Sequence, residues 1–312
     1  MTTSQTDWSF GGAWPFVAKW FETAVGKIHY IDEGPKDGIP VVFVHGNPTW
    51  SYVYRRFIEA VLGWDFRAIA MDHLGFGRSD KPAQSGDYTI EAHADRCEEL
   101  LESLDLRDAI IVVQDWGGPI GLPWAARHPD RVSGLFILNT FFSRPTEKVP
   151  LPMILKAFRT PIIGDLLVKG AHAFVRGFLF QAGLNNPDRL SRTDRAAYLA
   201  PHPTWSSRTG ILAFPRQIPS GPQGQISDFV DREGSALAAA FRDRPVKIVW
   251  PMKDVAFLPE TLEDMWVPMF PDAQIVQVQS AGHFIQEDAH ETVIPELMDF
   301  IGRDVCAQKV VT

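Results

Sequence analysis

The chain has 312 residues, 45% of them apolar, which is enough to bury a sizeable core in one large α/β domain or two smaller ones. A net charge of −8 and the lack of any run of lysines and arginines argue against nucleic acid as a partner. No stretch approaches the roughly 20 apolar residues that a membrane span requires, so we expect no membrane partner.

The N-terminus and the cysteines indicate where the protein resides. The first residues, MTTSQTDWSF, have neither the basic start nor the apolar segment of a secretory signal. Cys97 and Cys306 are far apart, lack the spacing of metal ligands and suit a reducing compartment. We therefore expect a cytoplasmic protein with no metal site and no cofactor.

Short apolar runs in the first half of the chain predict parallel strands. Residues 40–45 (PVVFVH), 66–72 (FRAIAMD) and 109–115 (AIIVVQD) are mainly apolar, and each run stops at a turn or a polar sequence. Residues 89–106 have apolar side chains at helical spacing, and Thr89 can cap this helix. The order strand, helix, strand predicts a parallel sheet with right-handed crossovers.

The second half of the chain continues this pattern after one long interruption. A predicted helix at 119–128 leads into a strand at 134–140. Residues 141–219 then carry no strand signal and contain helical stretches. Strand signals return at 246–254 and 273–283, before a C-terminal amphipathic helix.

The predicted class is therefore α/β, with a mostly parallel central sheet, helices on both faces and an inserted helical cap. We expect residues 1–142 and 216–312 to form the core and residues 143–215 to form the cap.

Polar residues gather at the predicted strand ends, where open parallel sheets place their active sites. The polar or turn residues at these ends are His45, Asn47, Asp72, Asp115, Trp116, Asp254 and His283. Asp115 and Asp254 could be turn aspartates, and His283 could be a packed histidine. We favour the functional interpretation because Asp115 follows consecutive β-branched residues, where a carboxylate is costly to bury. The chain order Asp115, Asp254, His283 is also that of nucleophile, acid and histidine in α/β-hydrolases.

Other motifs are interpreted as structural. The sequence GFGRSD after Asp72 lacks both the lysine of a phosphate-binding loop and a third glycine, so it predicts a turn. The remaining histidines considered as metal ligands show no ligand pairing in their spacing. These are His93, His128, His172, His202 and His290.

The stretch VVQDWGGPIG, residues 112–121, has the apolar lead-in, the tight turn and the small residues of a nucleophile elbow. Asp115 stands where such an elbow usually carries serine. A serine must lose its proton to a base as it attacks, whereas a carboxylate is already ionised at neutral pH. A carboxylate can therefore displace a leaving group from saturated carbon, forming an ester. The chain is either an inactive hydrolase or one that uses this chemistry.

Five motifs occur in the order HGNPTWSYVYR, GFGRSDKP, QDWGGPIG, WPMKDVAF and AGHFIQED. With them the chain resembles the α/β-hydrolase superfamily and, more narrowly, the haloalkane dehalogenases, from about residue 20 to residue 300. The resemblance implies Asp115 as nucleophile, His283 as base and Asp254 as the acid. It also implies that Asn47 and Trp116 bind the departing halide.

Two positions decide which branch of that family the chain resembles. In one branch the acid follows the strand that in this chain ends with Asn139 and Thr140. Neither of these residues is acidic, so the resemblance assigns the role of the acid to Asp254. Another branch takes a second halide-binding tryptophan from the cap, but Trp205 lies near the predicted end of the cap. The combination of an Asp-His-Asp triad with an Asn-Trp halide pair resembles a third branch.

The resemblance implies two chemical steps. Asp115 displaces the halide of a small apolar haloalkane, and a water activated by His283 then hydrolyses the alkyl ester to a primary or secondary alcohol. We expect the backbone N–H groups of Asn47 and Trp116 to stabilise the oxyanion. Substrate, water and halide are the expected partners, and monomer or homo-oligomer is left open. Cap-side residues suited to an apolar pocket are Phe141, Phe142, Phe174, Phe178, Leu179 and Phe180.

Three alternatives are weighed. Epoxide hydrolases share the aspartate nucleophile but use cap tyrosines, and only Tyr198 falls in the predicted cap. A different reaction at the same site, on a haloacid or of the luciferase type, is a second alternative, although a haloacid needs arginines that the flanks of Asp115 lack. A non-catalytic α/β-hydrolase-fold binding protein is the third, and the intact triad argues against it.

Overall fold

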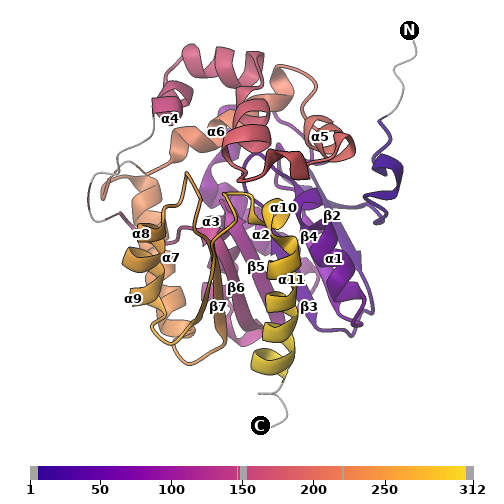
Figure 1. Ribbon diagram of the computed structural model, residues 1–312, viewed down its shortest axis with the longest axis vertical. Coiled ribbons are helices and arrows are strands. Elements are labelled where there is room, and N and C mark those ends of the chain that lie inside the picture. Colours follow the sequence, from indigo (N-terminus) through magenta and orange to yellow (C-terminus); the bar gives the residue numbers. More distant parts are fainter. Residues whose placement is uncertain (1–5, 146, 148–152, 220, 307–312) are drawn as a thin grey trace.

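The computed structural model describes residues 6–145, 147, 153–219 and 221–306, and in these residues eight strands form one sheet in the order β1-β2-β4-β3-β5-β6-β7-β8 (Figure 1). β1 and β2 pair antiparallel, as do β2 and β4, and the other neighbours are parallel. The predicted α/β class with a mostly parallel sheet is confirmed. The strands are β1 (Lys19–Thr23), β2 (Gly26–Glu33), β3 (Pro40–Val44), β4 (Arg67–Met71), β5 (Ala109–Asp115), β6 (Val132–Thr140), β7 (Val246–Pro251) and β8 (Gln274–Val278).

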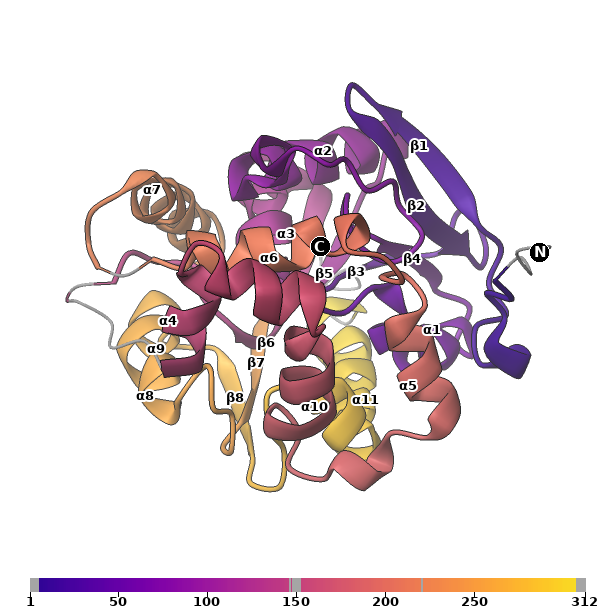
Figure 2. The same cartoon turned by 90° about the horizontal axis from the view of Figure 1, so that it is seen from above.

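Helices cover both faces of this sheet (Figure 2). α2, α3 and α7 pack together on one face, while α1 and α11 pack together on the other. Because both faces are covered, β3, β4 and β5 are buried along their whole length, which explains their continuous apolar sequences. The covering helices are α1 (Arg55–Leu62), α2 (Ile90–Ser103), α3 (Gly117–Arg127), α7 (Gln225–Ala240) and α11 (His290–Asp299).

The described residues between β6 and β7 form helices and no strand, and most of these helices form a cap above the carboxyl ends of the strands (Figure 1). α6 runs across the predicted boundary between residues 215 and 216, and the domain boundaries stay a prediction. The helices of the cap are α4 (Met153–Arg159), α5 (Arg192–Leu199), α6 (Thr209–Gln217) and the π-helical segments Asp165–Gly170 and Phe174–Ala182. Short helices outside the cap are α8 (Pro259–Thr261), α9 (Val267–Met269) and α10 (Ile285–Asp288).

The predicted strands coincide with β3 to β8, although β8 ends at Val278 and the chain reaches His283 as a loop. Thr89 caps α2 by accepting a hydrogen bond from Ala92 N at 3.3 Å. The hairpin of β1 and β2 was not predicted, because its two-residue turn, Ala24-Val25, lacks the Asn or Gly typical of such turns. No helix in the described ranges is long and apolar enough to cross a membrane.

Candidate active site

Asp115 is the last residue of β5 and has a left-handed backbone, with φ of 52°. This conformation is uncommon for a residue with a side chain and is found where the surrounding structure enforces it. Two glycines make the turn possible. A Cβ on Gly46 would lie 2.4 Å from the Asp115 side chain, and a Cβ on Gly117 would lie 2.1 Å from Val44 O. The strand-turn-helix corner thus lifts the carboxylate above the sheet.

The Asp115 carboxylate is buried and held by backbone donors. Asn47 N donates to its Oδ1 at 2.8 Å, and the backbone N–H of Trp116 also donates to the carboxylate. Burial raises the pKa of Asp115 to about 6, although the charge of His283 and both backbone donors oppose this rise. At neutral pH the side chain is therefore mainly ionised, and it is more basic than an ordinary aspartate.

His283 lies between two carboxylates. Its Nδ1 is 3.1 Å from each oxygen of Asp254, and its Nε2 is 3.6 Å from Asp115 Oδ2. Burial of the ring opposes its charged form, but the charge and hydrogen bond of Asp254 and the charge of Asp115 outweigh burial and raise the pKa of His283. The three residues that the sequence placed at separate strand ends thus meet in one buried cluster.

Two amide side chains that the sequence reasoning did not single out as functional fix the histidine. Gln114 Nε2 and Asn139 Nδ2 both donate to the backbone oxygen of His283, at 3.0 and 2.8 Å. Asn139 Nδ2 also lies 2.7 Å from Asp254 Oδ2. The position of Gln114 directly before Asp115 was the available signal, and Asn139 was weighed only as a place for the acid.

The loop that carries His283 is tied to the cap. The Asp288 carboxylate accepts from Gly282 N at 2.8 Å and from Asn185 N, in the cap, at 2.6 Å. Phe284 N donates to Gly183 O at 3.1 Å. Backbone donors on both sides of the histidine are thus occupied, so the position of its ring depends on the cap as well as on the sheet.

The side chains of Asn47 and Trp116 lie beneath cap helix α6. Asn47 Nδ2 donates to Ile211 O across a long 3.3 Å, and its buried Oδ1 has no hydrogen-bond partner among the described residues. The indole of Trp116 makes edge contacts with Phe141 at 5.1 Å and with Phe214 at 5.2 Å. Both side chains therefore lie between the elbow and the cap, and aromatic rings surround the indole of Trp116.

Aromatic rings surround His283. Phe284, Phe178 and Phe257 have ring centroids 4.7, 5.1 and 5.7 Å from the imidazole. Of the six cap-side residues suited to a pocket, Phe178 touches His283 and Phe141 touches Trp116. The other four, Phe142, Phe174, Leu179 and Phe180, are buried in the core. This environment suits an apolar substrate.

A separate polar cavity of about 640 Å³ lies between the cap and the start of α2. Its lining includes Thr89, Arg159, Asp165 and Arg216 and none of the five predicted site residues. Among the described residues no group of three or more His, Cys, Asp or Glu side chains could hold a metal ion.

Comparison with known proteins places this geometry in a family. A family model described as "alpha/beta hydrolase fold" matches residues 39–290. The chain is also 35% identical to haloalkane dehalogenase 2 of Mycobacterium tuberculosis, covering 93% of this chain and 96% of that protein. The chain belongs to the haloalkane dehalogenase family of the α/β-hydrolases.

Other members of the family are similar over most of their length. A cis-3-alkyl-4-alkyloxetan-2-one decarboxylase of Shewanella oneidensis is 37% identical, covering 92% of this chain and 89% of the relative. Among solved structures, the haloalkane dehalogenase DbeA of Bradyrhizobium elkani has a TM-score of 0.83 and 27% identity, covering 94% of this chain and 99% of its own. The predicted family is confirmed, and its members carry names for two different reactions.

Proposed function

We propose that this member of the dehalogenase family hydrolyses carbon–halogen bonds of apolar haloalkanes through an alkyl ester on Asp115. The observation that supports this most is the buried, left-handed Asp115 carboxylate, with His283 Nε2 3.6 Å from its Oδ2 and a backbone donor on its Oδ1. Asn47 N thus holds Oδ1, while Oδ2 faces the histidine. The nucleophile needs no base for this first step.

In the first step Asp115 Oδ2 attacks the carbon that bears the halogen, and the carbon–halogen bond breaks with both electrons leaving on the halide. Charge moves onto the halogen in an apolar site, where fixed donors are worth far more than in water. In this proposal the indole N–H of Trp116 and the side-chain N–H of Asn47 donate to the departing halide. The long Asn47 contact to Ile211 O is one that such an ion could replace.

In the second step water attacks the ester carbon, and His283 takes its proton. Esterification removes the negative charge of Asp115, which is one cause of the raised pKa of His283. The pKa of His283 should therefore fall once the ester forms, so the imidazole becomes a free base when a base is needed. Asp254 orients the ring, and the backbone N–H groups of Asn47 and Trp116 that donate to the Asp115 carboxylate stabilise the oxyanion.

The tyrosines argue against epoxide hydrolysis. Tyr198, the tyrosine of the predicted cap, donates its hydroxyl to Glu287 at 2.5 Å. Tyr52, Tyr54 and Tyr88 also donate to groups other than Asp115. These four tyrosines are thus already engaged and are not available as donors to an epoxide oxygen.

A second candidate function is decarboxylation of a cis-3,4-dialkyl oxetan-2-one, the reaction that the name of the Shewanella relative states. Loss of carbon dioxide from this four-membered lactone would leave an alkene and consume no water. The same neutral donors, Asn47 and Trp116, would suit the carboxylate that forms as the ring opens.

A substrate panel distinguishes these functions. We expect bromide and acid from a 1-bromoalkane, and no diol from a 1,2-epoxyalkane. Asp115→Asn keeps the shape of the side chain and should abolish bromide release, while removal of a buried charge should leave the fold at least as stable. Alkene and carbon dioxide from a cis-dialkyl oxetanone without bromide release would favour the second candidate. No turnover of any of the three would favour a binding protein.

The pH dependence of the first step should report Asp115. Because only the ionised carboxylate attacks, the rate of the first halide release should fall about tenfold per pH unit below the pKa of about 6. Rapid mixing with a bromoalkane, with bromide measured before turnover, isolates this step. A rate that stays constant down to pH 5 would mean that the nucleophile is an ordinary exposed carboxylate.

A further inference from the structure

The exposed apolar side chains of the cap are concentrated on one segment. Residues 153–166, here called the cap tip, carry five of the thirteen exposed large apolar side chains among the described residues. They are Met153 at 79% exposed, Ile154 at 53%, Ile162 at 74%, Ile163 at 50% and Leu166 at 58%. Exposed apolar residues grouped in this way mark an interaction surface, whereas single ones do not.

The cap tip is one compact turn. Thr160 N donates to Lys156 O and Gly164 N donates to Thr160 O, at 3.2 and 2.8 Å. A Cβ on Gly164 would lie 2.0 Å from Phe158 O, so the chain after α4 packs closely against that helix. The apolar side chains before and after the turn are therefore carried by one short, closely packed segment.

Ile162 is held at this turn against its own backbone preference. Its φ is 65°, a left-handed value that is an outlier for a β-branched side chain and costs about 1–3 kcal/mol. Glycine or asparagine would adopt it readily. An exposed isoleucine there does not stabilise the fold, so its apolar side chain calls for another explanation.

The cap is basic although the whole chain is acidic. Residues 153–219 hold nine lysines and arginines against three aspartates and no glutamate, a net charge of +6 in a chain of −8. The expectation of no membrane partner rested on the lack of a membrane span, which does not bear on docking at a membrane surface. A whole-chain charge averages over this basic cap and a strongly acidic remainder.

Several cations in or near the cap tip have no counter-charge. Among the ion pairs of the described residues, none involves Lys156, Arg159 or Arg176. Asp165, the one acidic residue between 153 and 176, is already 2.6 Å from Arg216. Arg159 donates to Ile218 O at 2.6 Å, whereas Lys156 and Arg176 are exposed and remain available for an external anionic partner.

We propose that the cap tip docks on an anionic lipid bilayer, with its apolar side chains among the upper acyl chains and its cations at the headgroups. A surface that is both apolar and basic matches the two layers of such a membrane. Symmetric pairing with a second copy of this chain would instead place cations against cations.

Docking at the cap tip would bring the membrane surface close to the proposed active site. Phe158 of α4 contacts Phe174 at 5.3 Å, Phe174 contacts Phe178 at 5.4 Å, and Phe178 contacts His283 at 5.1 Å. This row of rings joins the docked helix to the catalytic histidine. An apolar substrate dissolved in the bilayer would thus meet the cap on the side that leads to the site, a consequence that rests on the proposed function.

Vesicle sedimentation with the full chain tests the docking without measuring activity. We expect binding to vesicles of phosphatidylcholine with phosphatidylglycerol, and little binding to phosphatidylcholine alone. Ile162→Asn should weaken binding roughly tenfold or more through lost apolar burial, while its unfolding midpoint stays the same or rises. Lys156→Gln should weaken binding about fivefold at low salt, which corresponds to about 1 kcal/mol per basic residue.

Two variants far from the cap tip serve as controls. Trp64→Ser removes a side chain that is 70% exposed between α1 and β4, and Lys27→Gln removes an exposed cation of β2. Both should bind vesicles like the unaltered chain. Equal binding to neutral and anionic vesicles, or equal loss in the control variants, would overturn the proposal. The proposal would also be overturned if the unaltered chain bound no vesicles but formed an oligomer that Ile162→Asn dissociates.

Discussion

Replacing His283 by alanine should release one equivalent of halide per chain and then stop, leaving the alkyl group on Asp115. The first step needs only the ionised carboxylate, whereas hydrolysis of the ester needs a base, whose loss typically costs roughly 10²–10⁴-fold in rate. Mass spectrometry of the intact protein should show the mass of the alkyl group, and a peptide digest should place it on Asp115.

His290→Ala is the matched control for this result. His290 begins α11 and lies beside Glu291, outside the catalytic cluster, so this variant should turn over normally and show no adduct. If His283→Ala shows no added mass under conditions in which the unaltered chain releases halide, the covalent ester is refuted.

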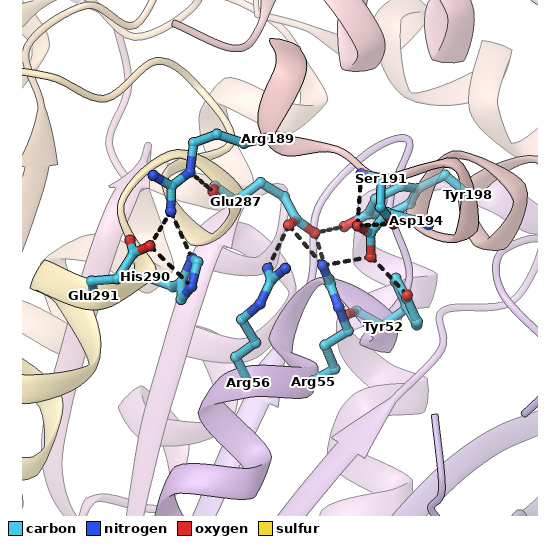
Figure 3. A network of polar contacts seen from close by, with 10 residues as sticks. All are labelled: Tyr52, Arg55, Arg56, Arg189, Ser191, Asp194, Tyr198, Glu287, His290 and Glu291. Carbon is cyan, nitrogen blue, oxygen red and sulfur yellow. Dashed lines mark hydrogen bonds and ion pairs between the residues drawn. The ribbon is translucent and has the colours of Figure 1, made fainter. Parts of the chain in front are cut away.

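Replacing Glu287 by alanine should destabilise the fold by about 3–5 kcal/mol, because it leaves a buried guanidinium without its main partner. Glu287 binds Arg55 through two hydrogen bonds, of 2.5 and 2.9 Å, and Arg56 at 2.8 Å (Figure 3). Tyr198 of the cap donates to the same carboxylate. The network thus joins α1, the cap and the helix that follows His283.

The destabilisation expected for Glu287→Ala depends on the burial of the ion pair between Glu287 and Arg55. Glu291→Gln is the control, since Glu291 pairs with Arg189 at 59% side-chain exposure, where such pairs contribute about 0–1 kcal/mol (Figure 3). Arg55 and neighbouring charges keep the pKa of Glu287 low despite burial, so its contribution should be lost as the pH falls through that lowered pKa. Urea unfolding of both variants measures the difference. Equal destabilisation by the two substitutions would contradict the assigned role.

The sheet was predictable from the sequence because its central strands are buried on both faces and are therefore continuously apolar. Asp115 and Asp254 stood out because each ends or follows such a strand, and His283 because it follows β8. The hairpin of β1 and β2 escaped prediction, since the half-exposed edge strand β1 has a weak apolar pattern and the two turn residues, Ala24 and Val25, include no glycine.

The parts of the site that could not be predicted are those formed by contacts between distant segments. Asn139 and Gln114 look like ordinary strand residues, and only the fold brings their amides to the backbone oxygen of His283. The tie from Asp288 of α10 to Asn185 joins segments about 100 residues apart in sequence and leaves no local pattern. The type of chemistry could thus be inferred from the residue types, whereas the groups that orient the catalytic side chains could be identified only from the three-dimensional structure.

The most direct test of the central claim is a single turnover in water enriched in oxygen-18, with the enzyme in excess over a bromoalkane. If Asp115 forms an ester that water attacks at the carboxyl carbon, the alcohol should carry oxygen-16 from the carboxylate. The peptide containing Asp115 should gain oxygen-18. An alcohol labelled with oxygen-18 in this first turnover, with an unlabelled Asp115 peptide, would mean that water attacks the substrate directly and would contradict the account.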